Sequence, residues 1–219
     1  MKQYIVIGCG RFGSSLATTM NLLGHQVMAI DKSEEIIQNL SDKVTHVAAV
    51  DVTDEYALRS LGLGNFDVAI IAIGSDIRAS IMATLIAKEM GVEQVVCKAK
   101  DELQAKVLYK IGADRVVFPE RDMGIRVAHN LVSSSILDYI ELSPDYSIIE
   151  IESPKEWYGK SMKELSLRSK YGINVMAIKR NNEVNISPDA DDVINKDDIV
   201  VAIGSAEDLT KLEGKIFRH

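Results

Sequence analysis

The sequence predicts an α/β fold: a doubly wound parallel sheet over the first two thirds of the chain, followed by a small α+β domain. Two observations support this expectation. Short apolar runs rich in β-branched residues alternate six times with helix-like stretches, which is the pattern of a parallel sheet covered on both faces. After residue 145 the alternation gives way to closely spaced short strands. A length of 219 residues suits one full domain and a smaller one.

The composition limits the class of protein. With 47% hydrophobic and 26% charged residues the chain has enough apolar material for a core, which excludes a disordered chain. The net charge of −7 disfavours binding to a nucleic-acid backbone or to an anionic membrane surface. No apolar run approaches the roughly 18 residues of a membrane span, and no signal-peptide pattern occurs. Only two cysteines occur, Cys9 and Cys97, too few for a disulfide framework, so we expect a cytoplasmic protein.

The expected elements follow in order along the chain. The apolar runs predict strands at 4–7, 26–30, 46–50, 68–73, 94–98 and 115–118. The stretches between them predict helices at 14–23, 33–40, 55–61, 77–90 and 102–111. Gly24, Gly91 and Gly112 directly follow three of these stretches, as expected of helix ends. We therefore expect helices that cross over a parallel sheet and cover both of its faces.

A glycine-rich loop, GCGRFG at residues 8–13, lies between the first expected strand and the first expected helix. In such a GxGxxG loop Gly8 permits the tight turn, Gly10 lets a phosphate approach the backbone, and Gly13 lets the helix pack closely on the sheet. The start of the helix offers unpaired N–H groups and the positive end of a dipole. The loop therefore predicts a Rossmann-like nucleotide site; the alternative is a loop that only packs.

Two charged residues bear on the ligand. Asp31 ends the second strand 23 residues after Gly8, near the spacing of the carboxylate that binds a ribose hydroxyl pair. This favours a nucleotide with a free 2′-hydroxyl over one with a 2′-phosphate, unless Asp31 only caps the helix that begins near Ser33. Arg11 places a cation in the phosphate loop, which suits a polyphosphate, unless it points to solvent or pairs with a carboxylate across a dimer interface. The loop alone does not separate a triphosphate from a dinucleotide.

Two more candidate contacts lie at the carboxyl ends of strands, where ligands bind in such sheets. Gly74 follows the fourth expected strand, and Lys98 ends the fifth, where a plain surface lysine is the alternative. No catalytic group accompanies them, because the four histidines lie in no Ser-His-Asp, Cys-His or HExxH context. The charged groups at 121–122 and 191–192 are typical of solvated loops. We find no positive sign of catalysis.

Three parts are expected along the chain: a nucleotide-binding domain at 1–122, a linker or dimerisation helix at 123–145, and a small α+β domain at 146–219. Residues 123–142 form a long amphipathic run, for which we expect a helix that packs on a partner such as another subunit. The small domain is expected to have strands at 147–152, 174–179, 183–186 and 198–203, a helix that begins at Ser161, and a last helix from 206 to about 212. Its size favours a sensing or dimerising role over half of an active site.

Short motifs recur through both domains. They are IGCGRFG at 7–13, AIG at 72–74, IGADR at 111–115, PERDMG at 119–124, KYG at 170–172, ISP at 186–188 and DDIV at 197–200. Together they resemble the cytosolic RCK-type gating subunits of Ktr and Trk potassium uptake systems, and the resemblance covers essentially the whole chain. It implies a regulatory protein without catalytic turnover.

The resemblance also implies an assembly. An octameric ring, built from dimers, would lie beneath a separate membrane subunit that conducts potassium. The chain would then be cytoplasmic and would be held at the inner face of the membrane through that partner. ATP and ADP bound at the glycine loop would favour different ring shapes and so different channel states.

Particular residues are implicated by the same resemblance. It implies a site for ATP or ADP, with NAD(H) as the weaker alternative, made from Gly8, Gly10, Arg11, Phe12, Gly13, Asp31, Gly74, Lys98 and Arg115. Arg11 is similar to a residue that reaches the terminal phosphate across a dimer interface, and Glu120 to a carboxylate that helps hold a divalent cation, Mg²⁺ or Ca²⁺, there. Some relatives bind cyclic di-AMP between paired C-terminal domains, where Arg168, Asn174 and Pro188 look placed for it.

Two other functions stay open. The same glycine loop and Asp31 fit an NAD(H)-dependent oxidoreductase or redox sensor, against which the missing acid–base residue argues. An interaction scaffold with an empty nucleotide fold would bind partners but no nucleotide. Nucleic acid is not an expected partner under any of these hypotheses, since basic residues are not concentrated in either part of the chain.

Overall fold

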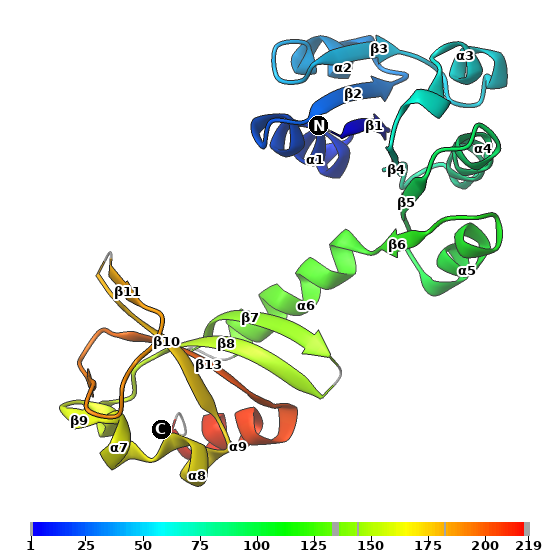
Figure 1. Ribbon diagram of the computed structural model, residues 1–219. Helices are drawn as coiled ribbons and strands as arrows, with labels where there is room; N and C mark the ends of the chain where they lie inside the picture. The colour runs from blue at the N-terminus through cyan, green and yellow to red at the C-terminus, as the bar shows by residue number, and fades with distance from the viewer. Residues whose placement is uncertain (1, 133–135, 144, 182, 217–219) are drawn as a thin grey trace. The chain divides into compact units, whose positions relative to one another are not determined.

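The computed structural model describes residues 2–132, 136–143, 145–181 and 183–216 (Figure 1). The chain folds into two compact units, Met1–Arg121 and Asp122–His219, and each is described on its own. Among the described helices, none is long and apolar enough to cross a bilayer.

The N-terminal unit is built on a parallel six-stranded sheet in the order β3-β2-β1-β4-β5-β6. Its strands are β1 (Gln3–Ile7), β2 (Gln26–Asp31), β3 (His46–Ala49), β4 (Val68–Ile71), β5 (Gln94–Lys98) and β6 (Arg115–Val117). All six predicted strands are present, and the predicted doubly wound parallel sheet is confirmed. Ile5, Val6 and Ile7 are fully buried, which explains why the strands read as continuous apolar runs.

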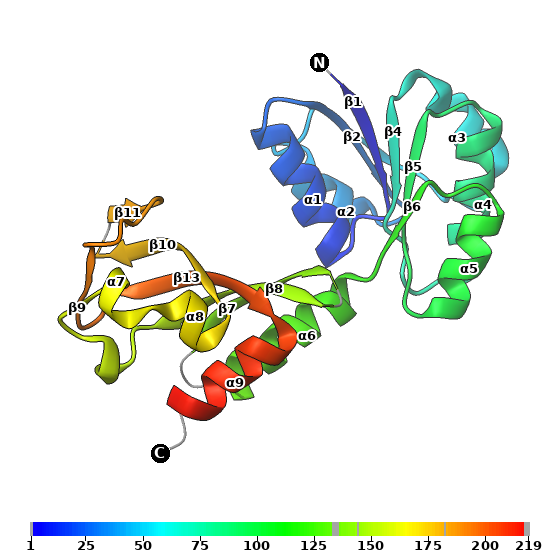
Figure 2. The same cartoon turned by 60° about the horizontal axis from the view of Figure 1, so that its bottom comes forward.

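Helices cover both faces of this sheet, α1 and α2 on one face and α3, α4 and α5 on the other (Figure 2). Their bounds are α1 (Arg11–Leu22), α2 (Glu34–Leu40), α3 (Glu55–Ser60), α4 (Ile77–Glu89) and α5 (Glu102–Lys110), with a short 3-10 turn η1 (Leu63–Asn65). Successive residues of β1 serve the two faces: Val6 packs with Ala17 and Leu40, whereas Ile5 belongs to the cluster that contains Leu58. All five predicted helices are present.

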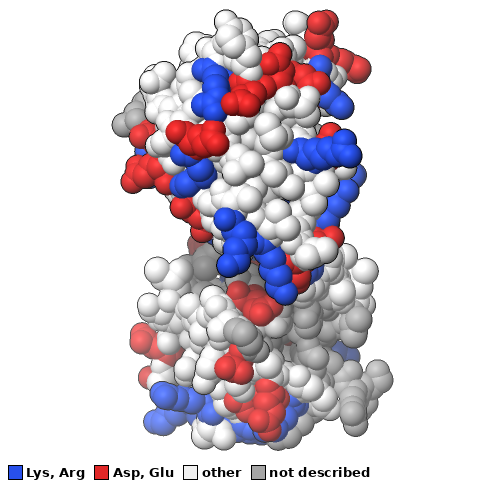
Figure 3. Space-filling model, turned by 90° about the vertical axis from the view of Figure 1, so that its right-hand side faces the viewer, with Lys and Arg blue, Asp and Glu red and all other residues white. Residues whose placement is uncertain are grey.

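The face of the N-terminal unit that carries α3, α4 and α5 has no extended patch of one charge. Figure 3 shows basic and acidic side chains interspersed among uncharged ones on this face. Several of them are paired, such as Arg59 with Glu55 at 2.8 Å and Lys88 with Asp114 at 3.0 Å. This face therefore differs from the basic surfaces with which proteins bind nucleic acids.

The C-terminal unit contains an antiparallel five-stranded sheet in the order β11-β10-β13-β8-β7 and a two-stranded pair, β12-β9. The strands are β7 (Ile136–Ser143), β8 (Tyr146–Glu152), β9 (Lys160–Ser161), β10 (Asn174–Arg180), β11 (Glu183–Asn185), β12 (Val193–Ile194) and β13 (Ile199–Ser205). α6 (Pro119–Val132) begins in the last residues of the N-terminal unit and continues into this one. The other helices are η2 (Lys155–Trp157), α7 (Met162–Leu165), α8 (Leu167–Tyr171) and α9 (Ala206–Ile216). The predicted α+β domain is confirmed, with Trp157 buried at its centre. β7, β9 and β12 were not predicted.

The helix predicted over residues 123–142 is wrong in its second half. α6 ends at Val132, and residues 136–143 form β7, which pairs antiparallel with β8. Residues 133–135 lie outside the described part of the chain. The apolar positions fit a helical period, but residues 136–140 are rich in β-branched and aromatic types, and pairing with β8 buries Ile136 beside Ile149 and Ile151. Tertiary pairing therefore overrides the local period.

An ion pair between a buried aspartate and an exposed arginine joins two strands of the C-terminal sheet. Asp198, directly before β13, is fully buried and accepts two hydrogen bonds of 2.8 Å from Arg180 at the end of β10. The N–H of Asn195 donates to the same carboxylate at 2.7 Å. Burial alone would raise the pKa of Asp198, but these hydrogen bonds outweigh burial and hold the pKa below its usual range. The carboxylate is therefore ionised at neutral pH.

We predict that Asp198→Asn lowers the free energy of unfolding by about 2 kcal/mol at pH 7, because it deprives Arg180 of its charged partner. Since the pKa of Asp198 is lower in the folded chain than in the unfolded chain, the ion pair stabilises fully above about pH 4 and progressively less below it. Urea unfolding of both proteins at neutral and acidic pH measures this difference. A difference that stays constant on acidification would contradict the assignment.

Candidate functional site

A cavity of about 400 Å³ lies at the carboxyl ends of β1, β2, β3 and β4. The strand order reverses between β1 and β4, and open α/β sheets bind ligands at such a point. The glycine loop, the residues that follow β2, β3 and β4, and the first turns of α2 and α4 line the cavity. Among the lining residues are Gly10 of the loop, Asp31 at the end of β2, Asp51 after β3 and Gly74 after β4.

The three loop glycines have three different roles. Gly8 has a φ of +93° and donates its N–H to the carbonyl of Ile30 at 2.8 Å, so the loop turns back onto β2. A Cβ on Gly13 would lie 2.0 Å from the carbonyl oxygen of Gly8, so α1 can approach the loop this closely only with glycine there. A Cβ on Gly10 would meet nothing within 4 Å. Gly10 is therefore an open position and not a packing position.

Helix α1 starts without a side-chain cap. Its N-cap residue is Gly10, and its first turn contains no acidic residue. The next four α-helices, α2 to α5, each have a Ser or Asp as N-cap, whose side chain accepts an N–H of the first turn. These residues are Ser33, Asp54, Asp76 and Asp101. The first-turn N–H groups and the positive dipole end of α1 are therefore free of a competing side chain and favour an anion.

Asp31 lies on the neighbouring strand and holds the loop. Its Oδ2 accepts the N–H of Cys9 at 2.7 Å, and its Oδ1 accepts the N–H of Ser33 at 2.9 Å. Ser33, and not Asp31, is the N-cap of α2. Each carboxylate oxygen keeps a further lone pair, and the group lines the cavity, so Asp31 is placed to accept hydrogen bonds from ligand hydroxyls.

The cysteine in the loop is not a reactive thiol. Cys9 is buried, and its Sγ lies 3.5 Å from the carbonyl oxygen of Ile30. Burial, together with the negative charge of Asp31, raises the pKa of Cys9 to about 12. The thiol is therefore protonated at neutral pH and does not supply the thiolate that redox chemistry needs.

A group of charged side chains lies beside the loop. Lys98, at the end of β5, is 9% exposed; its ammonium group pairs with Glu120 and lies 5.8 Å from the ring centre of Phe12. The hydrogen bond from Lys98, and more weakly the charge of Arg11, lowers the pKa of Glu120. A Cβ on Gly74 would lie 3.3 Å from Nζ of Lys98. The ammonium group of Lys98 is thus held next to Gly74, with Glu120 as its counter-ion.

Most residues that the resemblance assigned to a nucleotide or cation lie in or beside this cavity. Those that line it are Gly8, Gly10, Asp31 and Gly74. Those beside it are Arg11, Phe12, Gly13, Lys98 and Glu120. Arg115 is not brought to the site, because it begins β6 at the amino end, opposite Val96 and not opposite Lys98.

Sequence reasoning missed the cavity residues that follow β3. Asp51 and Thr53 line the cavity, and the predicted strand at 46–50 ended directly before them. The rule that pointed to Gly74, which places ligands at the carboxyl ends of strands, also applies to Asp51. No motif marked this position, since a single aspartate in a loop is common.

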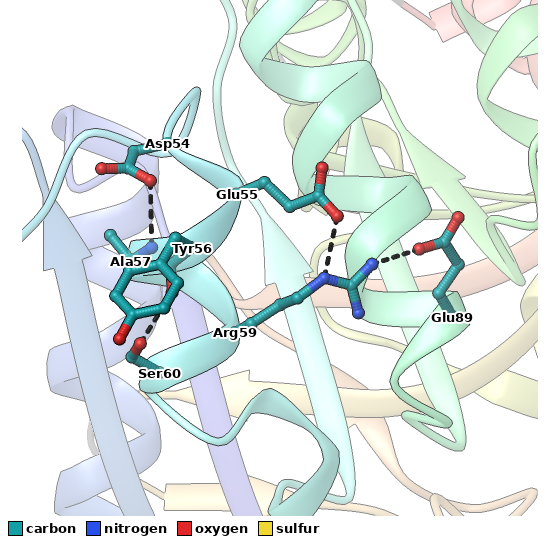
Figure 4. A network of polar contacts seen from close by, with 7 residues as sticks. All are labelled: Asp54, Glu55, Tyr56, Ala57, Arg59, Ser60 and Glu89. Carbon is teal, nitrogen blue, oxygen red and sulfur yellow. Dashed lines mark hydrogen bonds and ion pairs between the residues drawn. The ribbon is translucent and has the colours of Figure 1, made fainter.

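The loop that carries Asp51 leads into a helix that is tied to α4. Asp54 caps α3 by accepting the N–H of Ala57 at 3.1 Å. Arg59, one turn further along α3, donates to Glu55 at 2.8 Å and to Glu89 of α4 at 2.5 Å (Figure 4). Both helices follow segments that line the cavity, and the link joins the two helices near their C-terminal ends, outside the cavity.

A second cavity, of about 700 Å³, lies in the C-terminal unit. Arg168 of α8 and Asn174 of β10 line it, together with residues of α7 such as Lys163. Pro188, which the resemblance grouped with Arg168 and Asn174, does not line it.

No group of three or more His, Cys, Asp or Glu side chains able to hold a metal occurs within the described residues. Glu120 offers one carboxylate, which Lys98 already pairs. Mg²⁺ and Ca²⁺ take about six to eight oxygen ligands. Glu120 of a single chain does not by itself make a cation site, and the other ligands would have to come from a nucleotide or a second chain.

Comparison with known proteins matches a TrkA-N domain to residues 4–119 and a TrkA-C domain to residues 146–216. The chain is 46% identical to Ktr system potassium uptake protein C of Bacillus subtilis (strain 168), over 98% of this chain and 97% of the relative. It is 39% identical to Ktr system potassium uptake protein A of the same organism, over 98% and 96%. A solved structure of the GsuK channel bound to NAD matches 98% of this chain and 39% of its own, with a TM-score of 0.67 and 16% identity, so that likeness concerns the fold.

We predict opposite outcomes for alanine at two glycines of the loop. Gly13→Ala should lower the free energy of unfolding by roughly 2–4 kcal/mol, because its Cβ would collide with the carbonyl of Gly8. Gly10→Ala should change it by less than about 1 kcal/mol, since the Cβ meets open space, but should weaken binding of an anion that approaches the loop. Thermal unfolding and nucleotide titration measure the two effects, and equal destabilisation by both variants would contradict these roles.

Proposed function

The chain belongs to the family of TrkA-type potassium uptake proteins that includes Ktr system proteins A and C, and on this premise we propose that ATP and ADP bind at its glycine loop and control a separate membrane subunit that conducts potassium. It is a regulatory subunit of a potassium uptake system and not an enzyme. The oxidoreductase hypothesis is therefore not supported. We assign the chain to the cytoplasm, at the inner face of the membrane through its partner.

The observation that carries the proposal is the uncapped start of α1 beside the open position at Gly10. A phosphate chain is the ligand class that such a helix start favours, because its negative charge meets unpaired N–H groups and the positive dipole end. Asp31, on the next strand, is where a ribose would place its hydroxyls. Lys98 adds a nearly buried cation beside Gly74.

We assign Arg11 to the terminal phosphate of ATP. Its side chain is exposed at the first position of α1, and its charge reaches Glu120. ADP lacks the γ-phosphate, so an arginine that contacts this group distinguishes the two nucleotides. Only such a differential contact lets a ligand shift a conformational equilibrium. In a ring, Arg11 of one chain would reach the nucleotide of its neighbour.

The assembly we propose is an octameric ring built from dimers. Exposed apolar side chains on α6 support a dimer contact: Met123, Val127 and Leu131 are spaced by four residues and are 53%, 45% and 79% exposed. A second chain would cover this stripe. Glu120, in the first turn of the same helix, would contribute one ligand to a divalent cation, Mg²⁺ or Ca²⁺, completed by the neighbouring chain or the nucleotide.

Cyclic di-AMP is the ligand we propose for the cavity of the C-terminal unit, where it would act as an inhibitor. Arg168 supplies a cation for its phosphates, and Asn174 supplies an amide that both donates and accepts. Pro188 does not line this cavity within one chain. We therefore propose that it contacts cyclic di-AMP only where the C-terminal units of two chains pair.

NAD(H) is a second candidate ligand for the glycine loop, favoured by one observation. The GsuK channel, which shares the fold, has been solved with NAD. NAD carries the same adenosine and pyrophosphate as ADP, so the glycine loop and Asp31 would treat the two alike. Displacement of ATP by NADH at equilibrium would show that both use one site.

For Arg11→Ala we predict about tenfold weaker ATP binding and less than about threefold change in ADP binding, because only ATP carries the phosphate that Arg11 contacts. Isothermal titration calorimetry with each nucleotide measures both affinities. Arg115→Ala is the matched control, since it removes the same side chain from the amino end of β6 and should change neither affinity. Absence of ATP binding by the parent chain, or ATP binding unaffected by Arg11→Ala, would refute the proposal.

A separate prediction concerns the C-terminal unit. Arg168→Ala should weaken cyclic di-AMP binding about tenfold or more, because charge-assisted hydrogen bonds to phosphate are lost. ATP binding should not change, since the glycine loop belongs to the other unit. Titration of a fluorescent cyclic di-AMP measures the effect, with Lys155→Ala as a control cation outside the cavity. Unchanged affinity in Arg168→Ala would count against this site.

A further inference from the structure

Three neighbouring strands end in a spatial order that matches the parts of a nucleotide. β1 leads into the glycine loop, β2 ends at Asp31, and Asp51 follows β3. β2 lies between β1 and β3, and the N–H of Val50 donates to the carbonyl of Asp31 at 2.9 Å. Adjacent strands are about 4.8 Å apart. A nucleotide with its phosphates at the loop and its ribose at Asp31 therefore places its base at the end of β3.

We infer that Asp51 recognises the 6-amino group of an adenine and thereby makes the cavity select adenine over guanine nucleotides. The inference rests on the proposed function, which places the phosphates at the glycine loop and the ribose at Asp31. The cavity around Asp51 is apolar, lined by Ile36, Val50 and Val52, and so offers surfaces on which a planar ring can pack. Asp31, Lys32 and Asp76 also line the cavity, and Asp51 is the charged residue that follows β3, where the base would lie.

Thr53 orients the carboxylate of Asp51. Oδ1 of Asp51 accepts the N–H of Thr53 at 2.9 Å and its hydroxyl at 2.8 Å. Within the described part of the chain, no hydrogen bond reaches the second oxygen, Oδ2. The two bonds from Thr53, and the charge of Lys32 to a smaller extent, lower the pKa of Asp51. Asp51 is therefore ionised at neutral pH and presents an oriented acceptor with no proton to donate.

An acceptor of this kind distinguishes purines at C6. Adenine carries an amino donor there, whereas guanine carries a carbonyl acceptor. Against Asp51, adenine gains a charge-assisted hydrogen bond, whereas guanine would bring its carbonyl oxygen against the carboxylate, and two acceptors repel each other. Guanine also has donors at N1 and C2. Hypoxanthine shares the C6 carbonyl and the N1–H of guanine but lacks the 2-amino group, so comparing ITP with GTP isolates any contribution of that amino group.

Titration of the full-length chain with ATP, GTP and ITP tests the inference. The parent chain should bind ATP about tenfold or more tightly than GTP and ITP. Asp51→Asn should reduce this preference to about threefold or less, because an amide offers both a donor and an acceptor. Thr53→Val keeps the backbone donor but removes the hydroxyl, and should give an intermediate preference. Asp42→Asn removes the same charge from an exposed position outside the cavity and should retain the full preference.

The same titrations test the role of Asp51 separately from nucleotide regulation as such. Equal binding of ATP and GTP by the parent chain, or a preference that survives Asp51→Asn, would overturn the inference and leave nucleotide regulation standing. No binding of any triphosphate would overturn the proposed function and the inference with it. Asp51 and Thr53 are both exposed, so their variants should unfold at the same temperature as the parent, and this comparison verifies that altered binding does not reflect lost structure.

Discussion

The close approach of α1 to the glycine loop is the constraint on which the site depends. The space between Gly13 and the carbonyl of Gly8 admits no side chain, and this contact brings a helix start without a side-chain cap to the carboxyl edge of the sheet. Asp31 holds the loop from the next strand through the N–H of Cys9. The fold thus fixes unpaired N–H groups beside a cavity, and an anion satisfies them better than water or solvent-exposed side chains do.

Helix α6 contains residues of both the N-terminal and the C-terminal unit. Its first turn carries Glu120, the partner of Lys98, and one turn and a half later Arg126 donates to Asp138 of β7 at 2.7 Å. In the proposed regulation, a phosphate that attracts Lys98 away from Glu120 would change the charge balance at the start of a helix that is ion-paired to the C-terminal sheet.

Much of the N-terminal fold could be predicted, because strands buried on both faces read as continuous apolar runs. Gly8 and Gly13 could be predicted as well, since they occupy positions that only glycine fills without strain. Asp51 was not predicted, because no motif marks it and its place beside Asp31 depends on the pairing of β3 with β2. Arg115 was assigned by motif alone and lies at the amino end of β6. Residues 136–143 fit a helical period, and only their pairing with β8 makes them a strand.

Hydrogen–deuterium exchange of the full-length chain, with and without ATP, shows whether a phosphate binds at the start of α1. Backbone amides at the start of α1 have no partner of their own in the helix, so a phosphate bound there should slow their exchange. We expect slower exchange in residues 10–13, and in the loop at 50–53, when ATP is added. Unchanged exchange at the start of α1, with protection confined to the C-terminal unit, would contradict it.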